Sequence, residues 1–205
     1  MDAAPEPTVF VVDDDKAVRD SLRWLIESVG LNVEIFANSR EFLEGYKPAR
    51  PGCIVLDVRM PGISGMELQE KLASLQVTVP IIFITGHGDV KMAVRAVKAG
   101  ALDFIEKPFN DQELLDRVQR AIQLDAENRR AIEERSAIAR RLERLTPRER
   151  EVMELIIEGR LNKVIAARLG LSSKTVEAHR AKVMEKMQTK SVSVLVKMVL
   201  SSKRA

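Results

Sequence analysis

Five short hydrophobic runs recur along the first half of the chain, and amphipathic stretches with helical spacing separate them. The runs are rich in β-branched residues and are bounded by polar residues, so they predict strands at 8–12, 32–36, 53–57, 80–85 and 102–106. Between the first two runs, Leu22, Leu25, Ile26 and Val29 form one apolar stripe that ends at Gly30. This alternation predicts an α/β fold with a doubly wound, five-stranded parallel sheet, because right-handed crossovers place helices on both faces.

Polar residues mark where the helices of this part begin. The side chains of Ser, Asp and Asn can accept a hydrogen bond from the first turn, and a Glu three residues later can complete a capping box. The predicted helix starts are Asn38 with Glu41, Ser64 with Glu67, Asp89, and Asn110 with Glu113. The helix that Asp89 opens is expected to end at Gly100.

Residues 126–144 form a charge-dense stretch without Gly or Pro, which predicts a helical spacer that continues the fifth helix. Ile132, Ile138 and Leu142 are its sparse apolar positions, so a short coiled coil is an alternative interpretation. The pattern divides the chain into an α/β domain at 8–124, a helical linker at 125–142 and an all-helical domain at 143–205.

The last part of the chain shows helical patterns only. Thr146, Pro147 and Glu149 combine an N-cap, a proline at the first helical position and a capping-box glutamate, and this helix is expected to end at Gly159. The later boundaries are an N-cap at Asn162, a stop at Gly170, an N-cap at Ser172 or Ser173, and a fourth helix from about Ser191. Two short helices joined through glycine, the second of them basic, predict a helix-turn-helix within a four-helix domain.

The net charge of +3 conceals an uneven distribution along the chain. Residues 1–125 hold 14 basic and 20 acidic side chains, a net charge of −6, whereas residues 126–205 hold 19 and 10, a net charge of +9. This asymmetry favours two different tasks and makes the basic part a candidate for binding nucleic acid. The alternative is two solvated surfaces that differ in charge without a functional reason.

The hydrophobic runs are far too short to span a bilayer, and no signal peptide opens the sequence, so we expect a cytoplasmic protein without membrane contact. The single cysteine, Cys53, cannot form an internal disulfide. Its position within an apolar strand predicts a thiol packed in the core.

Polar residues with reactive or metal-binding side chains follow four of the predicted strands. Asp13 and Asp14 come after TVFVV, Asp57 ends CIVLD, Thr85 ends PIIFIT, and Lys107 follows LDFIE. Because parallel strands end along one edge of the sheet, we expect these side chains to meet in a single crevice.

This combination of side chains predicts a magnesium-dependent phosphoryl site. Asp57 can accept a phosphoryl group as an acyl phosphate, which Lys107 and Thr85 would contact. Asp14, Asp57 and a main-chain carbonyl at Arg59 could bind Mg²⁺, with Asp13 acting through water. Taken alone, the Asp13–Asp15 run is better explained as a helix N-cap cluster.

The sequence also resembles a known family. VFVVDDDKAVRDSL, VLDVRMPGISGMEL, FITGHGDVKMAV and AGALDFIEKPF resemble the receiver domain of two-component response regulators. LTPREREVMELIIEG and NKVIAARLGLSSKTVEAHRAKVMEKM are similar to LuxR-type DNA-binding domains. Together they resemble the FixJ-type regulators, over nearly the whole chain outside its N-terminal tail and the spacer.

The resemblance implies that a partner sensor histidine kinase phosphorylates Asp57, and that the protein acts on RNA polymerase as a transcriptional activator. It implies that Asp14 is a ligand of Mg²⁺ and that Asp13 supports it. It also implies a cis peptide at Lys107-Pro108, which proline permits. Such a protein is no enzyme beyond self-phosphorylation and slow self-dephosphorylation.

The same resemblance makes Thr85 and Phe104 the pair of residues that respond to phosphorylation. Phe104 departs from the tyrosine that many receivers carry, and the alternative is that it is simply a core aromatic. Phosphorylation is expected to cause dimerisation through the fourth helix, fifth strand and fifth helix, with contacts at Val90, Val94, Arg95 and Lys98. The two DNA-binding domains of the dimer are expected to touch through Leu195, Val196 and Val199.

The predicted recognition helix can be divided into two faces by its helical period. Val176, Val183 and Met187 fall on one side, which is expected to be buried. The residues expected to contact double-stranded promoter DNA are Glu177, Ala178, Ala181 and Lys182, with Lys163, Lys174 and Thr175 near the helix starts.

Two other classes of protein remain as alternatives. A phosphatase of the haloacid dehalogenase type also uses an aspartate nucleophile at a strand end. That chemistry requires a second carboxylate two residues later, where this chain has Arg59. A signalling adaptor that binds protein through its C-terminal helices is the third class, and the positive charge of the helix-turn-helix argues against it.

Overall fold

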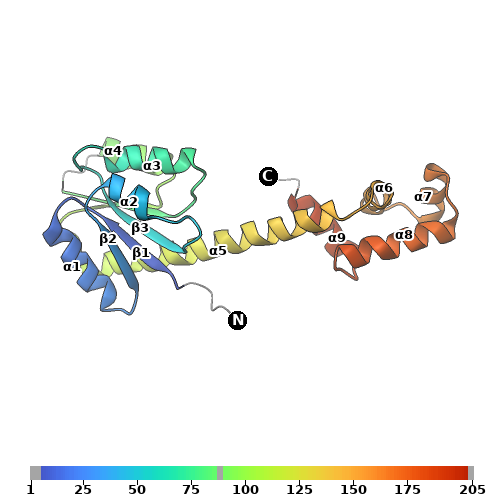
Figure 1. Ribbon diagram of the computed structural model, residues 1–205, viewed down its shortest axis with the longest axis horizontal. Coiled ribbons are helices and arrows are strands. Elements are labelled where there is room, and N and C mark those ends of the chain that lie inside the picture. The colour runs from blue at the N-terminus through green and yellow to red at the C-terminus, as the bar shows by residue number, and fades with distance from the viewer. Residues whose placement is uncertain (1–5, 87–89, 203–205) are drawn as a thin grey trace. The chain divides into compact units, whose positions relative to one another are not determined.

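The computed structural model describes residues 6–86 and 90–202, and it forms two compact units, Met1–Arg129 and Arg130–Ala205. The first unit contains a parallel sheet in the order β2-β1-β3-β4-β5 (Figure 1). Its strands are β1 (Thr8–Val12), β2 (Asn32–Phe36), β3 (Gly52–Asp57), β4 (Ile81–Thr85) and β5 (Asp103–Glu106). The doubly wound five-stranded sheet predicted from the hydrophobic runs is therefore confirmed.

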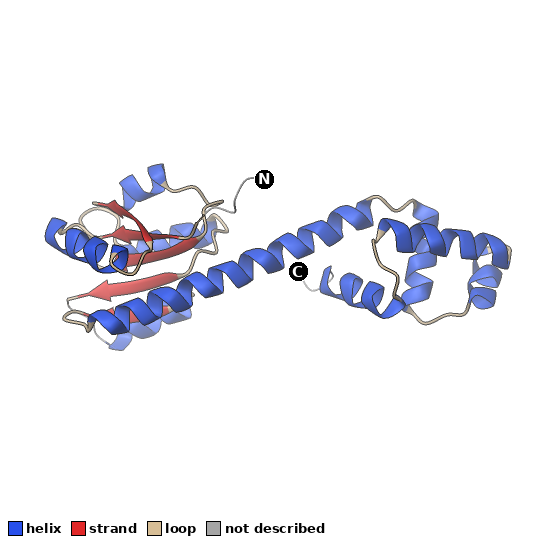
Figure 2. Ribbon diagram, turned by 90° about the horizontal axis from the view of Figure 1, so that it is seen from below, coloured by secondary structure: helices blue, strands red, loops and turns tan. Residues whose placement is uncertain are grey.

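Helices cover both faces of this sheet (Figure 2). They are α1 (Lys16–Glu27), α2 (Ser39–Gly45), α3 (Gly65–Ser74), α4 (Val90–Lys98) and α5 (Asp111–Glu143). Alternate residues of β1 point to two separate cores: Phe10 packs with Phe42 on one face, and Val9 packs with Ile26 on the other. Cys53 is fully buried beside Val9, and burial raises the pKa of its thiol.

Hydrogen bonds at the helix starts explain where these helices begin. Ser64 and Glu67 form the predicted capping box of α3. Asn38 accepts from the Glu41 N–H at 2.9 Å, whereas the Glu41 carboxylate accepts from the N–H of Ala37 and not from that of Asn38. Asp89, the predicted start of α4, lies outside the described residues.

The second unit contains the end of α5 and four further helices. These are α6 (Pro147–Ile157), α7 (Asn162–Leu169), α8 (Ser173–Lys186) and α9 (Val192–Ser202). Thr146 and Glu149 form the predicted capping box, and Ser172 caps α8. The predicted cap at Asn162 is wrong: Leu161 holds the N-cap position without a side-chain hydrogen bond, and Asn162 is already helical.

The predicted spacer is helical and continuous with the fifth helix, as α5 shows. The compact units divide after Arg129, so the boundary drawn at residue 124 from the sequence falls inside the first unit. Ile138 and Leu142 pack against the core of the second unit, which uses two of the three apolar positions that a coiled coil would need. Among the described helices, none is long and apolar enough to cross a membrane.

Candidate functional site

Three of the predicted site residues meet at the carboxyl edge of the sheet. Asp13 follows β1, Asp57 ends β3, and Lys107 follows β5. The Lys107 Nζ lies 2.7 Å from Asp13 Oδ2 and 3.0 Å from Asp57 Oδ1. Both carboxylate side chains are more than nine-tenths buried, so one ammonium group bridges two carboxylates and offsets part of their charge in a place largely closed to water.

The pKa values of Asp57 and Lys107 are both raised, but for different reasons. Burial raises the pKa of Asp57, and the hydrogen bond from Lys107 only partly opposes this. Burial lowers the pKa of Lys107, but its hydrogen bonds to Asp13 and Asp57 outweigh the effect and leave the pKa raised. The Arg59 N–H donates to Asp57 Oδ2 at 2.7 Å, which leaves the carboxylate held through both oxygens.

The three consecutive aspartates have different environments. Asp13 is buried, its Oδ1 accepts from the Asp15 N–H at 2.9 Å, and its carbonyl accepts from Arg19 at 2.6 Å. Asp15 is the N-cap of α1 and accepts from the Ala17 N–H. Asp14 is exposed at the mouth of the crevice. The N-cap interpretation of this run is therefore right for Asp15 only.

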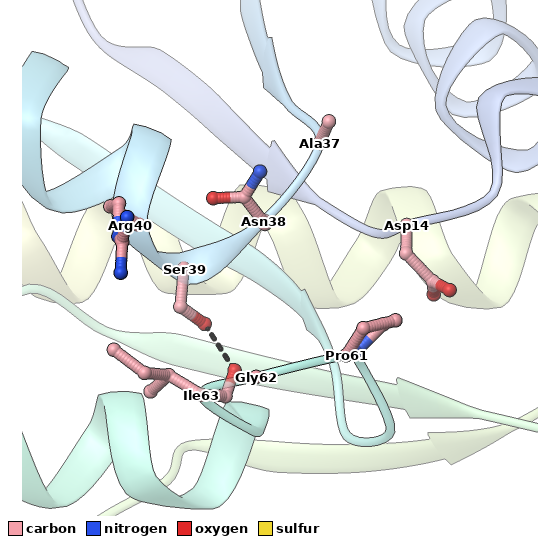
Figure 3. Close-up of a pocket in the computed structure, with 8 residues that line it drawn as sticks. All are labelled: Asp14, Ala37, Asn38, Ser39, Arg40, Pro61, Gly62 and Ile63. Carbon is pink, nitrogen blue, oxygen red and sulfur yellow. Dashed lines mark hydrogen bonds between the residues drawn. The ribbon is translucent and has the colours of Figure 1, made fainter.

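Asp14 also lines a cavity of about 390 Å³ beside the crevice (Figure 3). The other lining residues come from the start of α2 with the loop before it and from the loop before α3: Ala37, Asn38, Ser39, Arg40, Pro61, Gly62 and Ile63. The Ser39 hydroxyl donates to the Ile63 carbonyl at 2.8 Å, which joins the start of α2 to the loop before α3 (Figure 3). Asp14 thus remains accessible to a ligand at the side of the crevice.

The donor set suits a hard cation such as Mg²⁺. Among the residues that the structure describes, no three His, Cys, Asp or Glu side chains are grouped closely enough to hold a metal by themselves. Mg²⁺ does not need such a group, because it commonly binds through one or two carboxylates and keeps several waters. Exposed Asp14 and the Asp57 carboxylate offer oxygen atoms of the kind that Mg²⁺ prefers, and Lys107 already offsets part of the remaining charge.

Thr85 and Phe104 lie on the neighbouring strands β4 and β5. Thr85 is 1% exposed, and its carbonyl accepts from the Lys107 N–H at 2.8 Å. Phe104 is partly buried against the core that includes Ala96 of α4, and its ring centroid lies 6.5 Å from that of Phe83. The predicted cis peptide at Lys107-Pro108 is confirmed.

The predicted receiver contacts on α4 are exposed where they are described. Val94 is 46% exposed, Lys98 is exposed, and Arg95 is ion-paired with Glu70 of α3 at 2.9 Å. The side chain of Val90 lies outside the described part of the structure. Arg95 must therefore leave or share Glu70 if it is to contact a second molecule.

In the second unit, α8 has the two faces that its sequence predicts. Val176, Val183 and Met187 are fully buried. The side chains on the opposite face are exposed: Glu177, Ala178, Ala181, Lys182 and Glu185. Lys163 and Lys174 are exposed as well, whereas the Thr175 hydroxyl lies 2.8 Å from that of Ser172 within the cap.

Two of the three predicted contacts between DNA-binding domains are wrong. Leu195 is fully buried and Val199 is 3% exposed, because this stripe of α9 packs against the core of its own domain. Val196 is partly exposed. The helix is apolar on almost every side, so its sequence does not show which stripe faces inward.

The sequence interpretation also missed Trp24, the single tryptophan of the chain. It lies on α1, the helix that begins directly after the aspartate run, and it is 78% exposed. The sequence indicates its exposure, since Trp24 falls outside the apolar stripe of Leu22 and Ile26. Exposed tryptophans are common where one protein contacts another.

A buried aspartate held by lysine at the switch point of a doubly wound sheet, followed by a helix-turn-helix, defines a receiver joined to a DNA-binding domain. Residues 9–119 match the response regulator receiver domain, and residues 143–199 match the bacterial regulatory proteins of the luxR family. The chain belongs to the two-component response regulators that act as transcription factors. The resemblance to FixJ-type regulators is confirmed by the relatives that follow.

Nodulation protein W of Bradyrhizobium diazoefficiens is 48% identical over 197 residues, which cover 96% of this chain and 87% of that protein. The transcriptional regulatory protein FixJ of Azorhizobium caulinodans is 47% identical over 192 residues, covering 94% and 91%. The solved structure of the response regulator StyR matches with a TM-score of 0.88 at 48% identity, covering 95% of this chain and 98% of that one. Full-length FixJ from B. japonicum matches with a TM-score of 0.59 at 42% identity, covering 98% and 99%.

Proposed function

We propose that this protein is a transcriptional activator whose binding to promoter DNA depends on phosphorylation of Asp57 by a partner sensor histidine kinase. The observation that carries the proposal is the Lys107 ammonium, which joins buried Asp13 and Asp57 at the carboxyl edge of the sheet. The match of residues 9–119 to the response regulator receiver domain supports phosphorylation at this crevice.

The chain's own residues provide most of the chemistry of phosphoryl transfer. An oxygen of Asp57 attacks phosphorus, a phosphorus–oxygen bond forms, and the phosphorus–nitrogen bond to the kinase histidine breaks. Lys107 pairs with the phosphoryl oxygens, and the Thr85 hydroxyl donates to one of them. Asp14 and Asp57, with the Arg59 carbonyl and Asp13 through water, would hold Mg²⁺. When bound, the ion supplies neutralisation of the charge between carboxylate and phosphate.

Phosphorylation adds about −1.5 to −2 of charge to the crevice. Closure of Thr85 onto the phosphate leaves space for Phe104 to turn inward, and Phe104 packs against the core under α4. This would alter the α4 face, where Val94, Arg95 and Lys98 are the proposed contacts in a homodimer. Because Phe104 has no hydroxyl group, ring packing alone must carry this change.

In the dimer, two α8 helices would lie in the major groove at half-sites about one helical turn apart. Lys163 and Lys174 would contact phosphates, and Glu177, Ala178, Ala181 and Lys182 would face the bases, with Thr175 at the start of the helix. The bound dimer would then recruit RNA polymerase. Val196, the remaining candidate on α9, would lie between the two DNA-binding domains.

The experiment combines phosphorylation and DNA binding. The full chain is incubated with acetyl phosphate and Mg²⁺, its mass is measured intact, and its affinity is measured for a duplex selected from a random-sequence pool by the phosphorylated protein. We expect one added phosphoryl group, tighter DNA binding, and neither effect in Asp57→Asn. Full labelling of Asp57→Asn, or equal affinity with and without phosphate, would contradict the proposal.

A further inference from the structure

A third buried carboxylate of the first unit lies on α5, at the end of the unit that is opposite the crevice. Four of the five buried residues of α5 follow one another at spacings of three or four positions: Leu114, Val118, Ala121 and Asp125. Asp125 thus occupies the place where the apolar stripe would continue, and its side chain is 2% exposed. A carboxylate so deeply buried is costly unless it is fully hydrogen-bonded.

Asp125 is held by one main-chain group and one guanidinium group. Its Oδ2 accepts from the Gly52 N–H at 2.9 Å and from Arg129 Nε at 2.6 Å. Gly52 is the first residue of β3, the strand that ends with Asp57. The contact therefore joins α5 to the beginning of the strand that carries the phosphoacceptor.

Arg129 completes the arrangement through the rest of its guanidinium group. Its Nη1 donates to the Ala49 carbonyl at 3.2 Å, and its Nη2 donates to the carbonyls of Pro48 at 3.1 Å and Arg50 at 2.6 Å. Three successive main-chain carbonyls thus converge on one planar cation. A lysine could not reproduce this pattern, because its ammonium group presents a single point of charge.

The loop that Arg129 contacts is also fixed on its other side. Arg50 pairs with both oxygens of Glu34 at 2.6 and 2.7 Å and lies 5.2 Å from the centre of the Phe10 ring. The Thr8 N–H donates to the Pro51 carbonyl at 3.0 Å. A Cβ atom at Gly52 would lie 1.8 Å from the Thr8 carbonyl oxygen, so the start of β3 allows no larger residue.

The hydrophobic core alone does not hold α5 this far along the helix. The α5 residues that belong to or pack against the core of this face end at Ile122. Beyond that point, Asp125 and Arg129 make the contacts described above, and the compact unit ends at Arg129. The two polar residues therefore decide how far α5 remains attached to the first unit.

We propose that Asp125 and Arg129 form a coupling clamp: they position the end of α5 on the start of β3, so that phosphorylation of Asp57 is transmitted along α5 to the DNA-binding part of the chain. The proposal rests on the proposed function. In it, the two residues act by positioning and touch neither phosphate nor DNA. If the clamp is broken, the part of α5 around Asp125 and Arg129 detaches from the start of β3. Conformational changes in the receiver then no longer reach the residues that follow Arg129.

The test uses full-length Arg129→Lys, which keeps the charge but loses the planar donor pattern, and Asp125→Asn as a second variant. Arg130→Lys is the matched control, since Arg130 is the exposed next residue of the same helix. Three quantities are measured: labelling by acetyl phosphate from intact mass, hydrogen exchange at the Gly52 amide, and the ratio of DNA affinities with and without phosphate. The DNA is the selected duplex described above.

For both clamp variants we expect unchanged labelling, faster exchange at Gly52, and a phosphorylation-dependent gain in DNA affinity that falls by about 2–30-fold. The control should behave as the wild type. A variant that exchanges faster at Gly52 but keeps the full gain would show a structural role only and would overturn the coupling proposal. If the wild type itself showed no gain, the proposed function would fail, and the coupling role would fail with it.

Discussion

The Lys107 ammonium lies 3.0 Å from Asp57, on a strand end two places away in the sheet, and the same ammonium contacts Asp13. This pairing already offsets part of the negative charge of the crevice before phosphate arrives. We therefore expect Lys107→Ala to accept phosphate from acetyl phosphate, since Asp57 remains, but to show little gain in DNA affinity, since the phosphate loses its partner. Intact mass and DNA titration measure the two effects. A variant that labels and responds like the wild type would show that Lys107 serves only the unphosphorylated state.

Asp57→Asn should raise the melting temperature of the protein near neutral pH. Burial raises the pKa of Asp57, so the folded state favours the protonated form, and stability is lost as pH rises through that raised value. Because asparagine does not ionise, the Asp57→Asn variant avoids this loss of stability. The increase in melting temperature should be largest at neutral pH and small below about pH 3.9, where the aspartate of the unfolded chain is also protonated. Thermal unfolding without Mg²⁺ measures it, and exposed Asp14→Asn is the control, with a smaller effect.

The ion pair between Glu149 and Lys186 predicts acid sensitivity of the DNA-binding domain. Glu149 is 3% exposed, its carboxylate lies 2.6 Å from Lys186 Nζ, and this hydrogen bond lowers its pKa. The stabilisation is present above the unfolded pKa of about 4.3 and is lost as pH falls through the lowered value.

Glu149→Gln should therefore cost about 1 kcal/mol at pH 7, because glutamine keeps the capping contact but loses the charge. The cost should shrink towards pH 3. Exposed Glu151→Gln is the control and should change stability by less than about 0.5 kcal/mol. Denaturant unfolding at both pH values gives the difference, and an equal cost at both would exclude the ion pair as its source.

Trp24→Ala should slow phosphotransfer from the partner kinase by roughly tenfold while leaving labelling by acetyl phosphate unchanged. The reason is that Trp24 is exposed on α1, the helix that begins directly after Asp15, and a tryptophan at the centre of an interface contributes strongly to binding. Leu75→Ala, which removes another exposed apolar side chain, is the control. Equal loss with both phosphodonors would place the defect in the crevice and not in kinase binding.

Lys163→Ala and Lys182→Ala should weaken DNA binding in different ways. Lys163 is expected to contact phosphate, so its loss should weaken all sequences alike and reduce the salt slope by about 0.9 per subunit. Lys182 lies on the exposed face of α8, so its loss should change base preference by about 1–3 kcal/mol at one position. Titrations on matched and scrambled duplexes across a salt series separate the two. An unchanged preference in Lys182→Ala would mean that another face of α8 meets the bases.

The fold and the crevice could be predicted because each strand is a separate hydrophobic run and each reactive residue stands at its end. Asp57 and Lys107 are fifty positions apart, yet the rule that parallel strands end together places them side by side. Leu195 and Val199 were assigned to the surface because α9 is apolar on nearly all sides, so only packing decides which stripe is buried.

The contacts of Arg129 could not be predicted at all. Its partners are the main-chain carbonyls of Pro48, Ala49 and Arg50. Because every residue has a main-chain carbonyl, no pattern of side chains in the sequence predicts these contacts. The position of Asp125 does give a signal in the sequence, because it is a carboxylate on the buried stripe of α5. A charged residue at a core position of a helix was the one sign that a polar partner lay nearby.

The burial of Cys53 has a practical consequence for spectroscopy. It is the one thiol of the chain, it is fully enclosed in β3, and its raised pKa keeps it in the unreactive thiol form at neutral pH. A maleimide dye or spin label should therefore leave the native protein unmodified. A cysteine introduced at an exposed site such as Ser21 would then take up the label alone, and the native core would need no replacement of Cys53.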